Sequence, residues 1–141
     1  MSSVKISIAV FKGDPLDYTS CRHTGLVLEY DDQQLLLHVK GAHGFFEFEE
    51  AVRRKPVEES ERLALDGIIH VARIPAKDMD MFRAVVANTN VNNRERGWNC
   101  QNFVGDALRK VEEAHLISKE EFDEAIDKMA TVLLEATDYE L

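Results

Sequence analysis

The chain has 141 residues, of which 45% are hydrophobic and 30% are charged, and its formal net charge is −9. This length suits a single domain spanning residues 1–141, and this composition excludes a disordered chain. After residue 110, ten acidic residues stand against two lysines, so that stretch carries −8 and the rest of the chain carries −1. Because no basic stripe is available for phosphates, we expect no nucleic-acid partner.

The hydropathy of the chain and its number of cysteines indicate the cellular compartment in which we expect the protein. No apolar run approaches the ~20 residues that a membrane span needs, so we expect no stable membrane anchor. The first 15 residues lack the long apolar stretch of a signal peptide. Two cysteines, Cys21 and Cys100, are too few for a disulfide framework. These features predict a cytoplasmic protein in a reducing compartment.

The first half of the chain is rich in β-type patterns. Alternating runs predict strands at residues 4–11, 23–30, 34–40 and 67–74, with a weaker candidate at 44–49. The two aspartates at 31 and 32 predict a hairpin turn, and the highly charged residues 49–62 predict an excursion over the surface.

Helical spacing replaces this alternation in the second half. Apolar residues recur at intervals of three and four within 76–87, within 100–115 and after a capping box, Ser118 to Glu121. Strands followed by helices predict an α+β domain, with an antiparallel sheet packed against C-terminal helices. The acidic helix and tail at 118–141 are expected to be part of this domain.

Cys100 lies where a polar loop changes into a helix. Asn99 is a favourable N-cap, which puts Cys100 in the first helical turn. There the unpaired backbone N–H groups and the helix dipole favour a thiolate and could also bind an oxyanion. The alternative interpretation is a small buried cysteine without chemistry, a common fate of free cysteines.

Two histidines supply the other groups that a cysteine nucleophile needs, a base and a residue that orients it. His23 opens a predicted strand. If residues 31 and 32 form a two-residue loop, His38 shares the face of His23, one diagonal step or roughly 7–8 Å away. His43 is an alternative orienting residue, against the simpler interpretation of an exposed loop histidine.

Three segments resemble one known family: His-Thr-Gly-Leu-Val-Leu at 23–28, Leu-Leu-Leu-His-Val at 35–39 and Trp-Asn-Cys-Gln-Asn-Phe-Val at 98–104. Together they are similar to the lecithin retinol acyltransferase-like group of the circularly permuted papain-like superfamily. The resemblance implies a permuted papain-like fold and acyl transfer through a thioester. It makes Cys100 the nucleophile, His23 the base and later the acid, and His38 the orienting residue.

The same resemblance implies a small-molecule acyl or peptide-like substrate, since family members attack esters, amides and peptide-like bonds. Whether water or another acceptor takes the acyl group separates a hydrolase from a transferase. Two alternatives stay open: a peptidase or isopeptidase of the same fold, and a non-catalytic binding module that has lost activity. The chain departs from the family in its longer hairpin and in having no C-terminal hydrophobic anchor, which disfavours a membrane lipid.

The remaining candidates are weaker. The histidines have no recognisable metal-ligand spacing, so we expect no metal site, and no motif predicts a cofactor. Cys21 would share the face of His23 if the strand begins early, and it is interpreted as a free thiol. A regulatory disulfide between Cys21 and Cys100 is the minor alternative. Arg22 is a further hypothetical contact for a substrate carbonyl or carboxylate.

Overall fold

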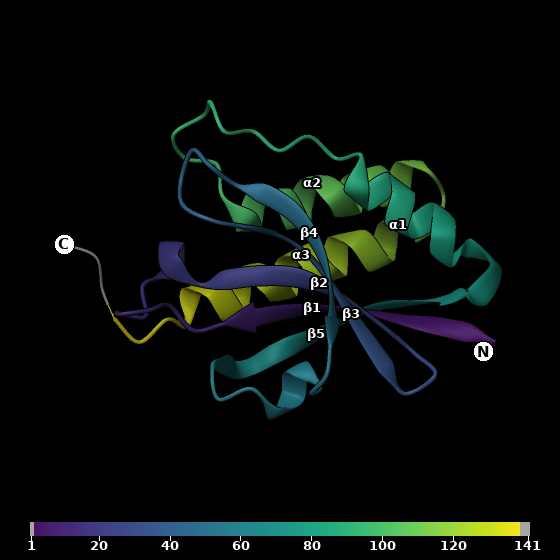
Figure 1. The fold of residues 1–141 in the computed structure, drawn as a ribbon, viewed down its shortest axis with the longest axis horizontal. Helices are drawn as coiled ribbons and strands as arrows, with labels where there is room; N and C mark the ends of the chain where they lie inside the picture. Colours follow the sequence, from purple (N-terminus) through teal and green to yellow (C-terminus); the bar gives the residue numbers. More distant parts are fainter. Residues whose placement is uncertain (1, 139–141) are drawn as a thin grey trace.

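The computed structural model describes residues 2–138. Its strands are β1 (Ser3–Phe11), β2 (His23–Tyr30), β3 (Gln33–Lys40), β4 (Glu47–Arg53) and β5 (Leu63–Pro75). Its α-helices are α1 (Met79–Ala87), α2 (Cys100–Glu113) and α3 (Lys119–Leu134). Strands therefore precede helices along the chain, which confirms the predicted α+β class (Figure 1).

The strands form one antiparallel sheet in the order β4-β3-β2-β1-β5. The β2–β3 hairpin has the predicted two-residue loop, because Tyr30 pairs with Gln33. Both loop residues, Asp31 and Asp32, have positive φ angles of 47° and 59°. Positive φ at both central positions is typical of the turn that matches the right-handed twist of a hairpin.

The prediction was wrong for the segment after this hairpin. Residues 49–53, expected in a surface excursion, belong to β4, which begins at Glu47 rather than at residue 44. Their charges misled the interpretation because β4 is an edge strand, and an edge strand tolerates charged side chains. The last strand is also longer than expected and begins at Leu63.

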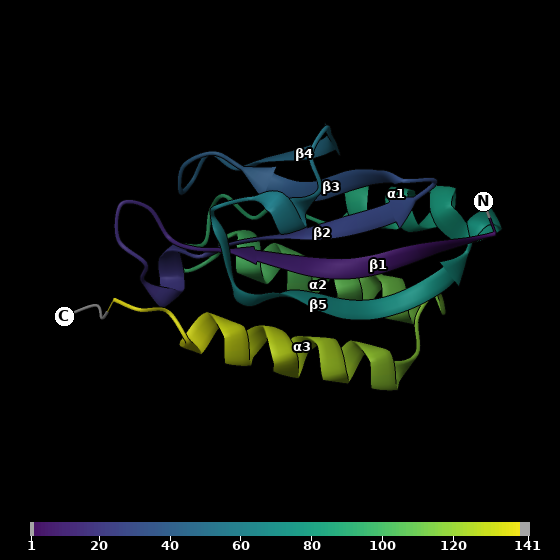
Figure 2. The ribbon, with the colours of Figure 1, turned by 90° about the horizontal axis from the view of Figure 1, so that it is seen from below.

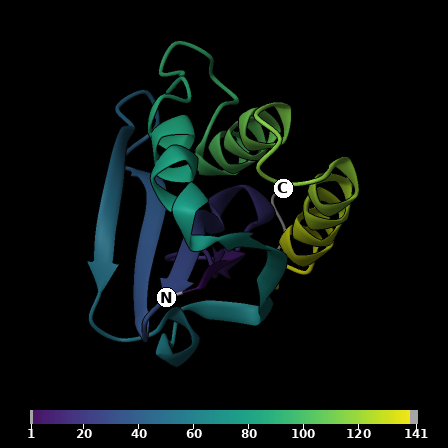
Figure 3. The same ribbon diagram turned by 90° about the vertical axis from the view of Figure 1, so that its right-hand side faces the viewer.

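All three α-helices lie on one side of the curved sheet (Figures 2 and 3). Helix α2 packs on β2 and β3, and α3 packs on β5 and β1. This layer contains the main core, whose fully buried side chains include Ile6, Ile8, Leu26, Leu37, Phe82, Phe103 and Leu108. The opposite face of the sheet, called here the open face, carries only a small apolar cluster of Ala9, Phe11, Val27, Leu36 and Val57.

The C-terminal helix follows its sequence signals closely. Ser118 accepts a hydrogen bond from the backbone N–H of Glu121, and Glu121 accepts one from Ser118, so the predicted capping box is present. Within residues 2–138, no helix combines the length and the apolar character that a membrane crossing requires. The end of the predicted acidic tail, residues 139–141, lies outside the described residues.

The larger of the two buried apolar clusters lies at the helix–sheet interface. We expect Leu108→Ala to lower the free energy of unfolding by about 2–5 kcal/mol, because Leu108 is fully buried and its truncation leaves a cavity. The same substitution at Leu65, which is 80% exposed, is expected to cost less than ~0.5 kcal/mol. Urea denaturation of the two variants measures the difference, and equal losses would contradict this core assignment.

Candidate active site

Cys100 is the first residue of α2, as predicted, and Asn99 caps the helix. The Asn99 side chain accepts a hydrogen bond from the backbone N–H of Gln101 at 2.9 Å. The backbone N–H of Asn99 donates to the side chain of Asn102 at 3.0 Å, which completes a capping box. This cap fixes the helix start, and with it the direction in which Cys100 leaves the backbone.

The thiol of Cys100 is buried, with 8% of the residue exposed. Its sulfur lies 3.8 Å from the carbonyl oxygen of Arg22, to which the thiol donates a hydrogen bond. Burial raises the pKa of Cys100, although the N–H groups of Thr24 and of the first helical residues act in the opposite direction. The expectation that the helix N-terminus favours a thiolate is therefore corrected: desolvation outweighs the helix N–H groups.

His23 and His38 form the centre of a hydrogen-bonded chain on the open face. Nε2 of His23 lies 2.9 Å from Nδ1 of His38, so His38 is on the predicted face and in direct contact. Nε2 of His38 lies 2.9 Å from a carboxylate oxygen of Glu49. The other oxygen of Glu49 accepts a hydrogen bond from Lys40 at 2.7 Å. We call His23, His38 and Glu49 the relay.

Sequence reasoning missed Glu49 because it assigned the residue to the start of a surface excursion. The structure pairs Glu49 with His38 across β3 and β4, so their side chains share the open face. The hydrogen bonds from Lys40 and then His38 lower the pKa of Glu49 and keep it ionised near neutral pH. The only available signal was an acidic residue at the end of the weakly alternating run 44–49, which recognition of β4 as a strand would have made visible.

When His38 is neutral, the relay fixes which nitrogen of His23 is free. A carboxylate only accepts hydrogen bonds, so Nε2 of His38 carries a proton toward Glu49. In a neutral His38 ring, Nδ1 then accepts the proton of Nε2 of His23. A neutral His23 consequently keeps its lone pair on Nδ1. This is the atom able to take a proton from another group.

His23 is held in a partly apolar setting. Its ring stacks on Phe11 with 6.0 Å between the ring centroids. Burial, followed by the nearby charge of His38, lowers the pKa of His23 from 6.5 to about 4. The imidazole is therefore neutral at physiological pH, as a proton acceptor must be.

Cys100 and His23 approach β2 from different sides. Thr24 is fully buried beside the thiol in the helix layer, whereas His23 lies with Phe11 and Leu36 on the open face. Neighbouring residues of a strand point to opposite faces, so the backbone of β2 lies between the two groups. No hydrogen bond joins the thiol to the imidazole in residues 2–138.

The two groups nevertheless lie near the same stretch of one edge of β2. The pairing of β2 with β3 stops at Leu26 and Leu37, while β1 remains paired with β2 as far as His23. The Arg22 carbonyl accepts the hydrogen bond of the thiol, and the Thr24 N–H acts to lower the pKa of the thiol. These two backbone groups flank His23 and point to the same edge of the strand. The sulfur therefore lies at the β3 edge of β2, and the His23 ring contacts His38 of β3.

The glycine at position 25 of β2 allows side chains of β3 to lie close to the backbone of β2. A side chain at Gly25 would place its first carbon 2.8 Å from Leu36 and 3.1 Å from the Cβ of His38. Both distances are shorter than ordinary van der Waals contact. Gly25 thus leaves the space that His38 occupies beside the His23 position.

A buried ion pair anchors the start of β2. The guanidinium of Arg22 donates to both carboxylate oxygens of Asp17, at 2.9 and 2.7 Å, and to the carbonyl of Val132 at 2.8 Å. The Arg22 hydrogen bond is the main reason why the pKa of Asp17 is well below its usual range. Thr137 donates to the same carboxylate. Arg22 is therefore occupied inside the protein, and the hypothesis that it contacts substrate is wrong.

The other sequence candidates have simpler surroundings. His43 is exposed and lies edge-on to Phe46, away from the relay. Cys21 and Cys100 are both free, and Cys21 is exposed in a pocket that His23 and His38 also line. Among residues 2–138, no group of three or more His, Cys, Asp or Glu side chains is arranged to hold a metal ion.

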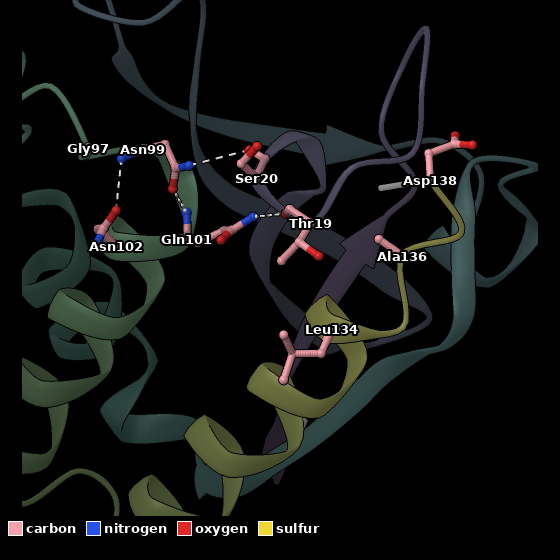
Figure 4. Close-up of a pocket in the computed structure, with 9 residues that line it drawn as sticks. All are labelled: Thr19, Ser20, Gly97, Asn99, Gln101, Asn102, Leu134, Ala136 and Asp138. Atoms are coloured by element: carbon pink, nitrogen blue, oxygen red, sulfur yellow. Dashed lines mark hydrogen bonds between the residues drawn. The ribbon is translucent and has the colours of Figure 1, made fainter. Parts of the chain in front are cut away.

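A groove of about 610 Å³ lies beside the N-terminus of α2 (Figure 4). Asn99 and Gln101 point across it toward Ser20 and Thr19. The last residue of α3, Leu134, and two residues of the chain after it, Ala136 and Asp138, form its far wall. The side-chain amides of Asn99 and Gln101 therefore lie at the N-terminus of α2, the helix end that contains Cys100.

Comparison with known proteins finds no family model, curated protein or solved structure that matches this chain.

The neutral state of His23 can be tested by titration. We expect its imidazole NMR signals to titrate with a pKa of about 4, and His38→Gln to raise that value because it removes a nearby charge. Unfolding returns the pKa toward 6.5, so the unfolded chain binds the proton first and the free energy of unfolding falls between pH 6.5 and about 4. His23→Gln should remove this contribution. Titration of His23 near pH 6.5 in the folded protein would contradict the burial argument.

Proposed function

We propose that this protein is a cysteine-dependent acyltransferase or hydrolase, with Cys100 as nucleophile and His23 as base. The observation that carries the proposal is the hydrogen-bonded relay of His23, His38 and Glu49, whose His23 lies between the two residues, Arg22 and Thr24, whose backbone groups contact the Cys100 thiol. Such a chain is typical of an oriented general base. The resemblance to the lecithin retinol acyltransferase-like group supports the same assignment of Cys100, His23 and His38.

In the proposed reaction, Cys100 attacks a substrate carbonyl while its proton passes to Nδ1 of His23. The bond between sulfur and the acyl carbon forms, and the bond to the leaving group breaks as His23 returns the proton to that group. Water or an acceptor alcohol or amine then attacks the thioester and releases the thiol. His38 and Glu49 hold the His23 tautomer and stabilise its positive charge.

The resting pair is expected to be a neutral thiol and a neutral imidazole. Burial raises the pKa of Cys100 and lowers the pKa of His23, so both shifts oppose a thiolate–imidazolium pair. Proton transfer would then accompany attack on the substrate rather than precede it. Hydrogen bonds between catalytic groups are often long before substrate binds. This behaviour fits a structure in which the Cys100 thiol bonds to the Arg22 carbonyl while the His23 ring bonds to His38.

A binding module without activity is the second candidate, favoured by the burial and raised pKa of Cys100. A peptidase or isopeptidase would use the same groups and differs only in its substrate. Release of amines from a peptide library would identify the protein as a peptidase or isopeptidase. Cytoplasmic location belongs to the proposal as well.

Acylation of the two cysteines provides the central test. We expect 4-nitrophenyl acetate to add one acetyl group to the wild-type protein, detected on Cys100 by peptide mass spectrometry. Cys100→Ser should abolish the adduct, and the matched variant Cys21→Ser should keep it. His23→Ala should slow acylation by about 100-fold, because it removes the base. Loss of the adduct only in Cys21→Ser would make Cys21 the nucleophile, and no adduct in any variant would favour the binding module.

Glu49 should act by positioning His38. We expect Glu49→Gln to slow acylation by about tenfold, because an amide no longer fixes the His38 tautomer or balances the charge of the imidazolium. Nitrogen chemical shifts of His38 should report the altered tautomer, which a merely structural role would leave unchanged. Glu47→Gln makes the same change of charge on β4 and is the control. Equal rates for the two variants, with an unaltered His38 tautomer, would remove Glu49 from the mechanism.

A further inference from the structure

The relay opens into a pocket of about 580 Å³ on the open face of the sheet. His23 and His38 form one side of it, and Phe11 and Leu36 provide apolar surface next to them. The remaining lining residues are Lys12, Asp14, Cys21, Arg53, Ser60 and Arg62. We call this the relay pocket.

The charge of the relay pocket is opposite to that of the whole chain. Lys12, Arg53 and Arg62 line it together with one acidic residue, Asp14, whereas the full chain carries −9. Arg62 lies 3.7 Å from Asp14, so these two charges offset one another. In residues 2–138, the side-chain nitrogens of Lys12 and Arg53 have no hydrogen bond or ion pair with the protein.

We infer that the relay pocket binds an anionic group of the substrate, a carboxylate or a phosphate, next to the acyl group that is transferred. Two cations without protein partners leave the pocket with uncompensated positive charge, which an anion would balance. A guanidinium such as that of Arg53 matches the paired oxygens of a carboxylate or phosphate. The position of the acyl group relative to this anion rests on the proposed function; binding of the anion does not.

The shape of the pocket limits the rest of the ligand. Leu36 lies between His38 and Arg53 along the paired strands β3 and β4, because Leu36 pairs with Ala51, His38 with Glu49 and Gln34 with Arg53. A short carbon chain can cover Leu36, so a substrate with its anionic group at one end and its ester or amide carbonyl at the other would span from Arg53 to the relay. Simple half-esters of dicarboxylic acids have this arrangement.

Binding can be measured without turnover in Cys100→Ser. We expect monomethyl succinate to shift the imidazole NMR signals of His23 and His38 in a saturable manner. Added salt should weaken this binding. Dimethyl succinate, which lacks the charge, should bind at least about fivefold more weakly. Inorganic phosphate is titrated separately: saturation by phosphate alone would identify a phosphate as the anionic group, and saturation by the half-ester would identify a carboxylate.

Matched charge variants locate the binding site. Arg53→Gln and Lys12→Gln, each made in the Cys100→Ser protein, should weaken binding about three- to fivefold. Arg73→Gln and Lys77→Gln remove the same charges at positions that do not line the relay pocket and should leave binding unchanged. Equal binding of the charged and neutral succinate esters without phosphate binding, or equal losses in pocket and control variants, would overturn the inference.

The two proposals fail separately. Saturable anion binding with no acyl adduct on Cys100 in the wild-type protein would preserve the anion pocket and remove the proposed enzyme. Acylation of Cys100 that is equally fast with charged and neutral esters, without anion binding, would preserve the enzyme and overturn the pocket assignment.

Discussion

The end of pairing between β2 and β3 is the constraint on which the site depends. Beyond Leu26 and Leu37 the two strands are no longer paired, so the backbone groups at the β3 edge of β2 beside His23 have no strand partner. The Cys100 thiol takes the hydrogen-bonding position that a paired strand would have filled, against the Arg22 carbonyl. A continuous ladder would occupy this edge. The end of pairing therefore leaves the thiol and the imidazole, which lie on different faces of the sheet, near the same stretch of the β3 edge of β2.

The surrounding structure holds both elements that meet at this edge, α2 and β2. The Asn99 capping box fixes the start of α2, while the buried pair of Arg22 and Asp17 ties the start of β2 to the chain after α3. Removing one partner of such a buried pair leaves an uncompensated charge, so the pair constrains the strand strongly. The acidic C-terminal region thus contributes more than surface charge: the residues that follow α3 support the peptide on which Cys100 rests.

Local rules predicted much of the fold. The strand limits at His23 and Tyr30, the turn at Asp31 and Asp32 and both helix caps follow from neighbouring residues, so sequence patterns describe them well. The face shared by His23 and His38 followed from the same turn, because loop length sets hairpin register. Glu49 was missed because its place depends on pairing between β3 and β4, which local charge obscured.

The sequence by itself determined the α+β class, the helix start at Cys100 and the common face of the two histidines, since each depends on short-range periodicity or capping. Only the tertiary structure decided the state of the thiol, because burial under the sheet outweighs the helix N–H groups and raises its pKa. It also decided that Arg22 is internal, that Glu49 completes the relay and that cations distant in sequence line one pocket. These properties depend on desolvation and on contacts between distant segments, and both arise only when the chain is folded.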